Sequence, residues 1–138
     1  MAGRTPFRVE ILTPEGQVFD DEVEMLSTRT AVGSIGVLAQ HTPLLALLEP
    51  TELRLFTSGS EVKAFAQGEG YLQVANSHAL VLVDEVFEKD DLDQSDLQDR
   101  LRKAEERVEK AEEDSEEKRQ AERDRRRYEA FLKLAGAR

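Results

Sequence analysis

The 138-residue sequence contains no cysteine, no excess of basic residues and no long apolar run. Without cysteine the chain cannot form disulfides, thiolate nucleophiles or cysteine-ligated zinc sites. No apolar stretch approaches the roughly 20 residues of a membrane-spanning helix. The first residues also lack the hydrophobic segment of a secretory signal, so we expect no export by that route. The net charge of −10 argues against nucleic-acid binding, which requires a basic surface.

Proline and glycine are concentrated in the first part of the chain. All four prolines and seven of the eight glycines lie before residue 71, and a stretch without either residue favours regular structure. The charge pattern changes as well. Residues 1–93 carry 6 basic and 16 acidic side chains, whereas residues 94–138 carry 13 of each. These changes predict two domains, residues 1–90 and residues 91–138.

Alternating apolar and polar residues predict strands in the first domain. Phe7, Val9 and Ile11 alternate with charged residues, which is the two-residue period of a strand with one buried face. Further strands are predicted around residues 17–19, 23–26, 53–56, 62–65, 71–74 and 80–83. Residues 80–83 are all apolar, which predicts a strand covered on both faces. Such short strands, separated by turn residues, indicate a β-sandwich or barrel.

The second domain has the pattern of two antiparallel helices, so the expected fold class is α+β. Its first apolar positions are spaced by four and three residues and would form one narrow helix face: Leu97, Leu101, Ala104, Val108 and Ala111. Acidic residues 112–117 repel one another and predict a turn, with Asp114 or Ser115 as the N-cap of a second helix. Ser95 and Gln98 predict a capping box at the first helix.

The contact between the two helices is expected to be weak. Apolar positions resume in the second helix at Ala121, Tyr128, Phe131, Leu132, Leu134 and Ala135. Alanine is common on both sides of this contact, and full burial of a leucine contributes only about 1.5–3 kcal/mol. We therefore expect a hairpin that can separate from the first domain and open.

Few residues have the pattern of a catalytic or metal site. Neither histidine lies in a catalytic or zinc-binding motif. His78 stands between two predicted strands, which is typical of a turn residue, and His41 is expected in a loop. We therefore expect no catalytic residue, no metal and no cofactor.

A basic cluster in the second helix is more informative. Arg119, Arg123, Arg126 and Arg127 recur at helical spacing on one side of the helix. Two interpretations remain open. In the first, the arginines are solvated and paired with neighbouring glutamates. In the second, they bind an acidic segment of another protein, because guanidinium groups match carboxylates in geometry.

Several sequence segments together resemble the epsilon subunit of F-type ATP synthases, as found in bacteria and chloroplasts. Residues 7–16 read FRVEILTPEG, and residues 33–46 read GSIGVLAQHTPLLA, which fits the characteristic pattern G-x-I/L-G-x(4)-H-x-P-L-L. Residues 65–71 and 82–85 match later family signatures. The sequence departs from the family at residues 50–51, where Pro-Thr replaces Pro-Gly, and at residues 68–70, where Gly-Glu-Gly replaces Gly-Gly.

This resemblance implies a ten-stranded β-sandwich followed by a mobile helical hairpin. It also implies a non-catalytic rotor subunit that binds the gamma subunit and the membrane ring of c subunits, with no lipid insertion and no nucleic acid. The implied location is the cytoplasmic face of a bacterial plasma membrane rather than a thylakoid. The contact loop would span residues 34–41, so the expected interface residues are Ser34, Ile35, Val37, Leu38 and His41.

The resemblance further implies that the hairpin can extend, reach the catalytic alpha and beta subunits and block ATP hydrolysis. Under this interpretation the four arginines would bind acidic residues of a beta subunit. Some family members also bind ATP through a motif [IL]-D-x-x-R-A, which residues 92–97 match only in part. Asp93 is kept, but Asp96 replaces the arginine and Leu97 the alanine. A carboxylate beside a triphosphate is repulsive, so weak or absent ATP binding is predicted.

Two alternatives differ in class from a rotor subunit. The first is a free-standing β-sandwich that dimerises through its helical tail, although two heptads are marginal for a stable coiled coil. The second is an enzyme that uses a cleft of the sandwich, which would require titratable side chains converging on that cleft.

Overall fold

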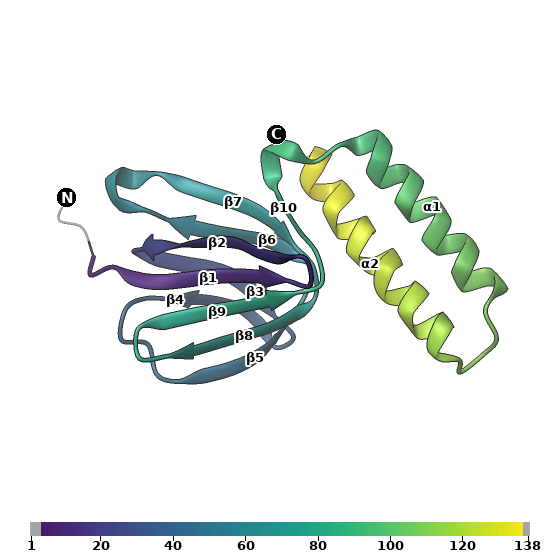
Figure 1. The fold of residues 1–138 in the computed structure, drawn as a ribbon. Helices are drawn as coiled ribbons and strands as arrows, with labels where there is room; N and C mark the ends of the chain where they lie inside the picture. The colour runs from purple at the N-terminus through teal and green to yellow at the C-terminus, as the bar shows by residue number, and fades with distance from the viewer. Residues whose placement is uncertain (1–3, 137–138) are drawn as a thin grey trace. The chain divides into compact units, whose positions relative to one another are not determined.

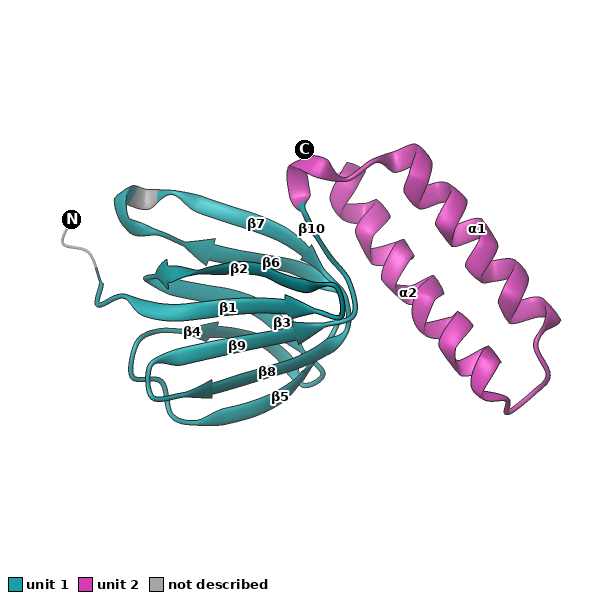
Figure 2. Cartoon of the chain, viewed as in Figure 1, with its two compact units in different colours: residues 1–88 teal, residues 89–138 magenta. Residues whose placement is uncertain are grey.

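The computed structural model describes residues 4–136, and the chain divides into two compact units, Met1–Glu88 and Lys89–Arg138 (Figure 2). The first unit is built of strands and the second of helices. The division lies two residues before the domain boundary expected at residues 90 and 91, close to the point at which the charge composition changes.

Ten strands form the first unit and confirm the predicted β-sandwich (Figure 1). They are β1 (Phe7–Thr13), β2 (Gly16–Val23), β3 (Met25–Thr30), β4 (Gly33–Val37), β5 (Leu44–Leu48), β6 (Thr51–Phe56), β7 (Val62–Gln67), β8 (Gly70–Ala75), β9 (His78–Val83) and β10 (Val86–Glu88). The strand order is β10-β7-β6-β3-β5-β8-β9-β1-β2, and β4 pairs with β3. The pairing of β1 with β9 is parallel, and the other pairings are antiparallel.

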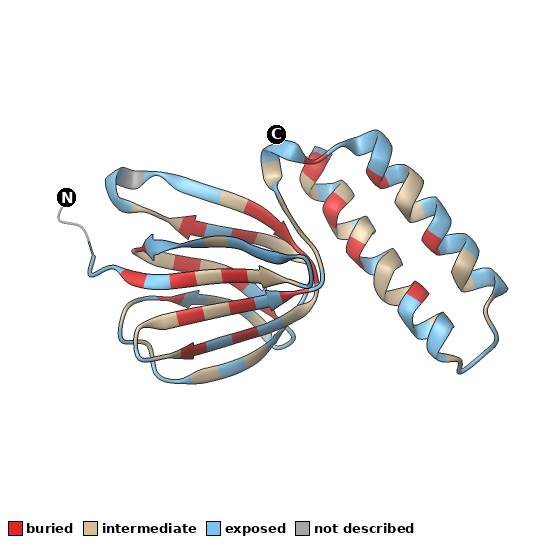
Figure 3. Cartoon of the chain, viewed as in Figure 1, coloured by how far each residue is buried: buried red, intermediate tan, exposed pale blue. Residues whose placement is uncertain are grey.

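One apolar core fills the space between the layers of the sandwich (Figure 3). In β1 the predicted alternation is confirmed, because Phe7, Val9 and Ile11 are at most 2% exposed. Among the described residues, Gln67 is a polar residue whose side chain is buried with no exposed surface. It accepts a hydrogen bond from the Thr28 hydroxyl at 2.7 Å and donates one to the Glu49 carbonyl at 2.9 Å. Its hydrogen bonds compensate for its burial.

Three strands have no alternating pattern in the sequence. β4 contains two glycines and a serine, β5 is apolar throughout, and β10 is only three residues long. The predicted strand at residues 23–26 is divided, because β2 ends at Val23 and β3 begins at Met25. The prediction that residues 80–83 are covered on both faces is wrong. Only one face of β9 turns into the core, and Leu82 on the other face is 38% exposed.

The second unit is a hairpin of α1 (Gln94–Lys110) and α2 (Glu116–Gly136), preceded by a 3-10 turn at Lys89–Asp91. The expected turn between the helices is confirmed, and Ser115 caps α2 by accepting a hydrogen bond from the Lys118 amide at 3.1 Å. The predicted capping box of Ser95 is wrong. Asp93 is the N-cap of α1, because its carboxylate accepts hydrogen bonds from the amides of Ser95 and Asp96 at 2.9 and 3.2 Å.

Candidate protein interaction surfaces

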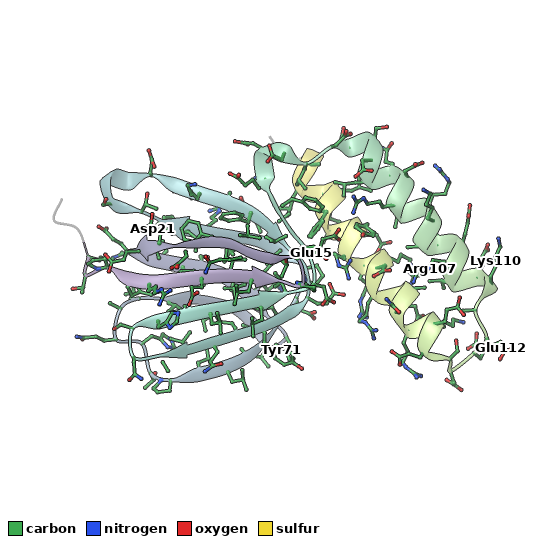
Figure 4. The ribbon with its side chains drawn as sticks, in the orientation of Figure 1. Glu15, Asp21, Tyr71, Arg107, Lys110 and Glu112 are labelled. Atoms are coloured by element: carbon green, nitrogen blue, oxygen red, sulfur yellow. The ribbon has the colours of Figure 1, made fainter. Side chains whose placement is uncertain are left out.

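A row of large apolar side chains crosses the outer side of the sandwich. Leu47 of β5 lies opposite Tyr71 of β8, Tyr71 lies opposite Leu82 of β9, and Leu82 lies opposite Leu12 of β1. Residues directly opposite in a sheet share one face. Leu45 lies two residues from Leu47 on the same face. We call Leu45, Leu47, Tyr71 and Leu82 the outer apolar face; Figure 4 labels Tyr71.

These four side chains are unusually exposed for their size. Leu45 is 70% exposed, Leu47 55%, Tyr71 51% and Leu82 38%. Contiguous exposed apolar side chains on a folded domain typically mark a binding surface. This surface was not predicted above, although the unbroken apolar runs at residues 44–48 and 80–83 are its signal in the sequence. A strand with apolar residues on both faces, but only one face in the core, must present the other to solvent or to a partner.

An open depression of about 700 Å³ lies at one end of this face. Leu12, Leu47, Tyr71 and Leu82 line it, and three acidic residues join them: Glu49, Glu69 and Asp84. Gly70 lets the backbones of β8 and β9 lie close together here, because an added Cβ would lie 1.9 Å from the Leu82 carbonyl oxygen. The glycine at this position of the Gly-Glu-Gly segment is therefore required for the close approach of β8 and β9.

Charged side chains occupy the other end of the same sheet face. The His78 imidazole Nε2 lies 2.7 Å from the Glu10 carboxylate, and Arg8 forms two hydrogen bonds to Asp20 at 2.9 and 3.0 Å. The Arg8 guanidinium lowers the pKa of Asp20 through these bonds and the attraction of opposite charge. His78 is thus not the predicted turn residue. It is the first residue of β9, and the turn lies at Asn76 and Ser77.

The expected contact loop at residues 34–41 is partly a strand. Ser34 and Ile35 belong to β4, and Leu38 follows it with 44% exposure. Val37 has no exposed surface and belongs to the core, so it cannot offer its side chain to a partner. Its expected role as an interface residue is therefore wrong, because strand alternation turns it inward while Gly36 and Leu38 turn outward.

His41 and an additional apolar residue complete this region. The His41 amide donates a hydrogen bond to the Leu38 carbonyl at 3.2 Å, and its Nδ1 lies 2.6 Å from the Thr42 carbonyl oxygen. His41 is thus held in a turn. Val32, at the tip between β3 and β4, is 97% exposed and was not predicted as a contact residue. β4 pairs only with β3, so one edge of β4 is open within the described sheet.

The basic cluster of α2 is not one uniform stripe. Arg119 and Arg123 both approach the Glu116 carboxylate, at 3.2 and 3.5 Å, and these hydrogen bonds lower the pKa of Glu116. Arg126 is exposed. The side chain of Arg127 is only 9% exposed and pairs with Asp124 at 3.1 Å. Arg127 is therefore not displayed on the surface of the folded hairpin as Arg126 is. The predicted contact of the four arginines with a beta subunit concerns the extended state and stays a prediction.

The remaining predicted site residues have structural partners. Asp93 caps α1, and Asp96 pairs with Arg100 at 2.9 Å, so both carboxylates of the partial ATP motif are engaged in the helix. Weak ATP binding stays a prediction. Within residues 4–136, no three acidic or histidine side chains are grouped so that they could hold a metal ion. No helix in this range has the length and hydropathy needed to cross a bilayer.

The fold and its exposed apolar face define the class of a protein-binding β-sandwich that carries a helical hairpin. The family model of the ATP synthase delta/epsilon chain β-sandwich domain matches residues 6–89. The ATP synthase epsilon chain of Sulfurihydrogenibium sp. (strain YO3AOP1) is 36% identical over 96% of this chain and 98% of its own length. That of Chloroflexus aurantiacus is 36% identical over 65% of this chain and 64% of its own.

Solved structures show the same fold at low sequence identity. A chain of the Euglena gracilis mitochondrial ATP synthase superposes with a TM-score of 0.74 at 18% identity, over 95% of this chain and 82% of that one. A chain of the Tetrahymena thermophila mitochondrial ATP synthase superposes with a TM-score of 0.61 at 17% identity, over 97% of this chain and 99% of that one. The chain therefore belongs to the ATP synthase delta/epsilon chain family and is an epsilon-type subunit.

Proposed function

We propose that this protein is a non-catalytic central-stalk subunit of a proton-translocating ATP synthase, which couples the gamma subunit to the c-ring and restrains ATP hydrolysis through its hairpin. The outer apolar face is the observation that carries the proposal, because a rotor subunit needs a permanent docking surface. The relatives named epsilon chain and the two superposed structures, described as F1/c-ring and central stalk/c-ring assemblies, support it.

The gamma subunit is the proposed occupant of the outer apolar face. Large apolar and aromatic side chains in one exposed cluster form the centre of most stable interfaces, and a polar rim surrounds them. Here Tyr71 lies between two leucines, and the charged pairs of Arg8 with Asp20 and of Glu10 with His78 flank the cluster on one side. The apolar centre would supply affinity, and the flanking charges would fix orientation.

The region of β4 is the proposed contact with the c-ring. Ser34, Leu38 and His41 offer side chains there, and the exposed Val32 extends the same hairpin of β3 and β4. Val37 supports this region from the core. The proposed location is the cytoplasmic face of a bacterial plasma membrane; the proposed contact with a membrane-embedded c-ring and the bacterial relatives support it.

The hairpin is the proposed regulatory element. At 1.5 Å per residue, α1 is about 26 Å long and α2 about 32 Å, so the open form spans nearly twice the length of the closed one. In the open form Arg119, Arg123, Arg126 and Arg127 are the arginines proposed to meet acidic residues of a beta subunit. In the folded hairpin Arg119 and Arg123 form ion pairs with Glu116. Binding to a beta subunit would replace the Glu116 carboxylate with a carboxylate of that subunit.

The family assignment favours a stalk subunit over a free-standing module that dimerises through its tail. The discriminating experiment is the ATPase rate of a complex reconstituted with the full chain or with a chain lacking residues 94–138. We expect both chains to be incorporated and only the full chain to inhibit hydrolysis. Equal rates would refute the regulatory role, and failure of the shortened chain to incorporate would refute docking by the sandwich alone.

A further inference from the structure

One carboxylate in the hairpin is shared by two arginines from different helices. Asp124 of α2 receives a hydrogen bond from Arg107 of α1 at 2.7 Å and one from Arg127 of α2 at 3.1 Å. The Asp124 side chain is 16% exposed and that of Arg127 9%, whereas that of Arg107 is 41% exposed. Arg107 therefore reaches from the surface of α1 to a largely buried carboxylate on α2; Figure 4 labels Arg107.

The apolar contact that accompanies this ion pair is small. The buried apolar residues of α1 are Leu97 and Ala104, and those of α2 are Ala121, Phe131 and Ala135. Three of the five are alanines, which bury little area. A second polar contact joins the helices, because the Arg100 guanidinium lies 5.7 Å from the centre of the Tyr128 ring. These polar contacts therefore add to a small fully buried apolar contact between α1 and α2.

The two ion pairs of Asp124 respond differently when the hairpin opens. Asp124 and Arg127 are three residues apart on one helix, so their contact survives separation of the helices. The contact of Asp124 with Arg107 joins the two helices and must break. A buried ion pair is costly to break when it leaves an uncompensated charge. Here Asp124 retains Arg127, and the half-exposed Arg107 returns to water.

We infer that Asp124 is the positioning residue that latches α1 to α2, and that its ion pair with Arg107 sets the balance between the closed and open hairpin. The latch holds the closed form without making opening prohibitive, because neither charge is left buried and unpaired. This inference rests on the proposed function in one respect, namely that the hairpin opens during regulation.

The test measures the open fraction of the free full-length chain. The sequence has no cysteine, so cysteines introduced at the exposed Glu105 of α1 and Glu129 of α2 take spin labels at defined sites. Pulsed electron paramagnetic resonance then gives the distribution of distances between the two spin labels, and thus between the helices. We expect Asp124→Asn to raise the ratio of open to closed chains about fivefold, the effect of losing a partly exposed ion pair. Arg107→Gln should have the same effect.

A matched control separates the latch from general loss of charge. Asp99→Asn removes an ion pair with Arg102, but both partners lie on α1, so the open fraction should stay unchanged. The double variant of Asp124→Asn and Arg107→Gln should open no more than either single variant, since each removes the one Asp124 contact that joins the two helices, and the contact of Asp124 with Arg127 lies within α2. The helical circular dichroism of each variant should equal that of the unmodified chain.

Three results would overturn the inference: Asp124→Asn behaving like Asp99→Asn, additive effects of the two single variants, or loss of helix in Arg107→Gln as well as in Asp124→Asn. Because the distances are measured without any partner, they are independent of ATPase inhibition. A chain that opens as expected but fails to inhibit a reconstituted complex would count against the proposed function alone.

Discussion

Shortening two leucines of the outer apolar face should weaken binding to the gamma subunit without destabilising the fold. Leu45 is 70% exposed and Leu47 55%. Full burial of a leucine contributes about 1.5–3 kcal/mol, so burying these exposed parts would contribute about 1–2 kcal/mol each. The double variant L45A/L47A should therefore lose about 2–4 kcal/mol of binding free energy, which corresponds to a roughly 30- to 700-fold higher Kd for the gamma subunit. Titration calorimetry with purified gamma subunit measures this change.

The control uses apolar residues that are exposed elsewhere on the sandwich. Val18 of β2 is 46% exposed and Val62 of β7 48%, and neither belongs to the outer apolar face. V18A/V62A should bind gamma like the unmodified chain. Both double variants should keep the free energy of unfolding, because the removed atoms already face solvent. Unchanged binding by L45A/L47A, or equal weakening by the control, would refute the assignment of the docking surface.

Three further predictions concern stability. Gly70→Ala should destabilise the sandwich by about 3 kcal/mol in urea unfolding, since its Cβ would overlap the Leu82 carbonyl, and an unchanged midpoint would contradict the strand geometry. Asp93→Ala should cost the hairpin about 1 kcal/mol through loss of the α1 cap, seen as reduced helicity, whereas Ser95→Ala should cost little. Glu116 has a lowered pKa in the fold, so its contribution is present above the ordinary glutamate pKa and lost as the pH falls through its folded value. Helicity should decline over that acid range, and less so in Glu116→Gln.

Much of the fold could be predicted because alternation and helical spacing report burial directly. Phe7, Val9 and Ile11 show the period of β1, and the charge-rich tail shows the hairpin. β5 could not be recognised in this way, since all five of its residues are apolar and pairing with β8 and β3 assigns their faces. The cap of α1 was misplaced by two residues because Asp93 and Ser95 are both good caps, and local sequence alone does not decide between them.

The interaction surfaces were less predictable than the fold. Strand alternation turns Val37 into the core and leaves Leu38 outside. Residues 34–41 were expected to form a loop, and a loop has no such alternation. Arg127 has the same helical spacing as its exposed neighbours, but Asp124 holds it inside the hairpin. The pair of Arg107 and Asp124 spans 17 positions across a turn, so no periodic pattern marks it. The sequence pattern does not report contacts between separate helices or strands.

The central claim is that the sandwich alone is the docking platform and that the hairpin adds regulation without adding affinity. The apolar core of the first unit lies wholly within residues 7–86, so this unit has what it needs to fold by itself. The most direct measurement is the Kd of the gamma subunit for the full chain and for a chain lacking residues 94–138. We predict equal values. A markedly weaker Kd for the shortened chain would show that the hairpin is part of the docking surface and would contradict the account.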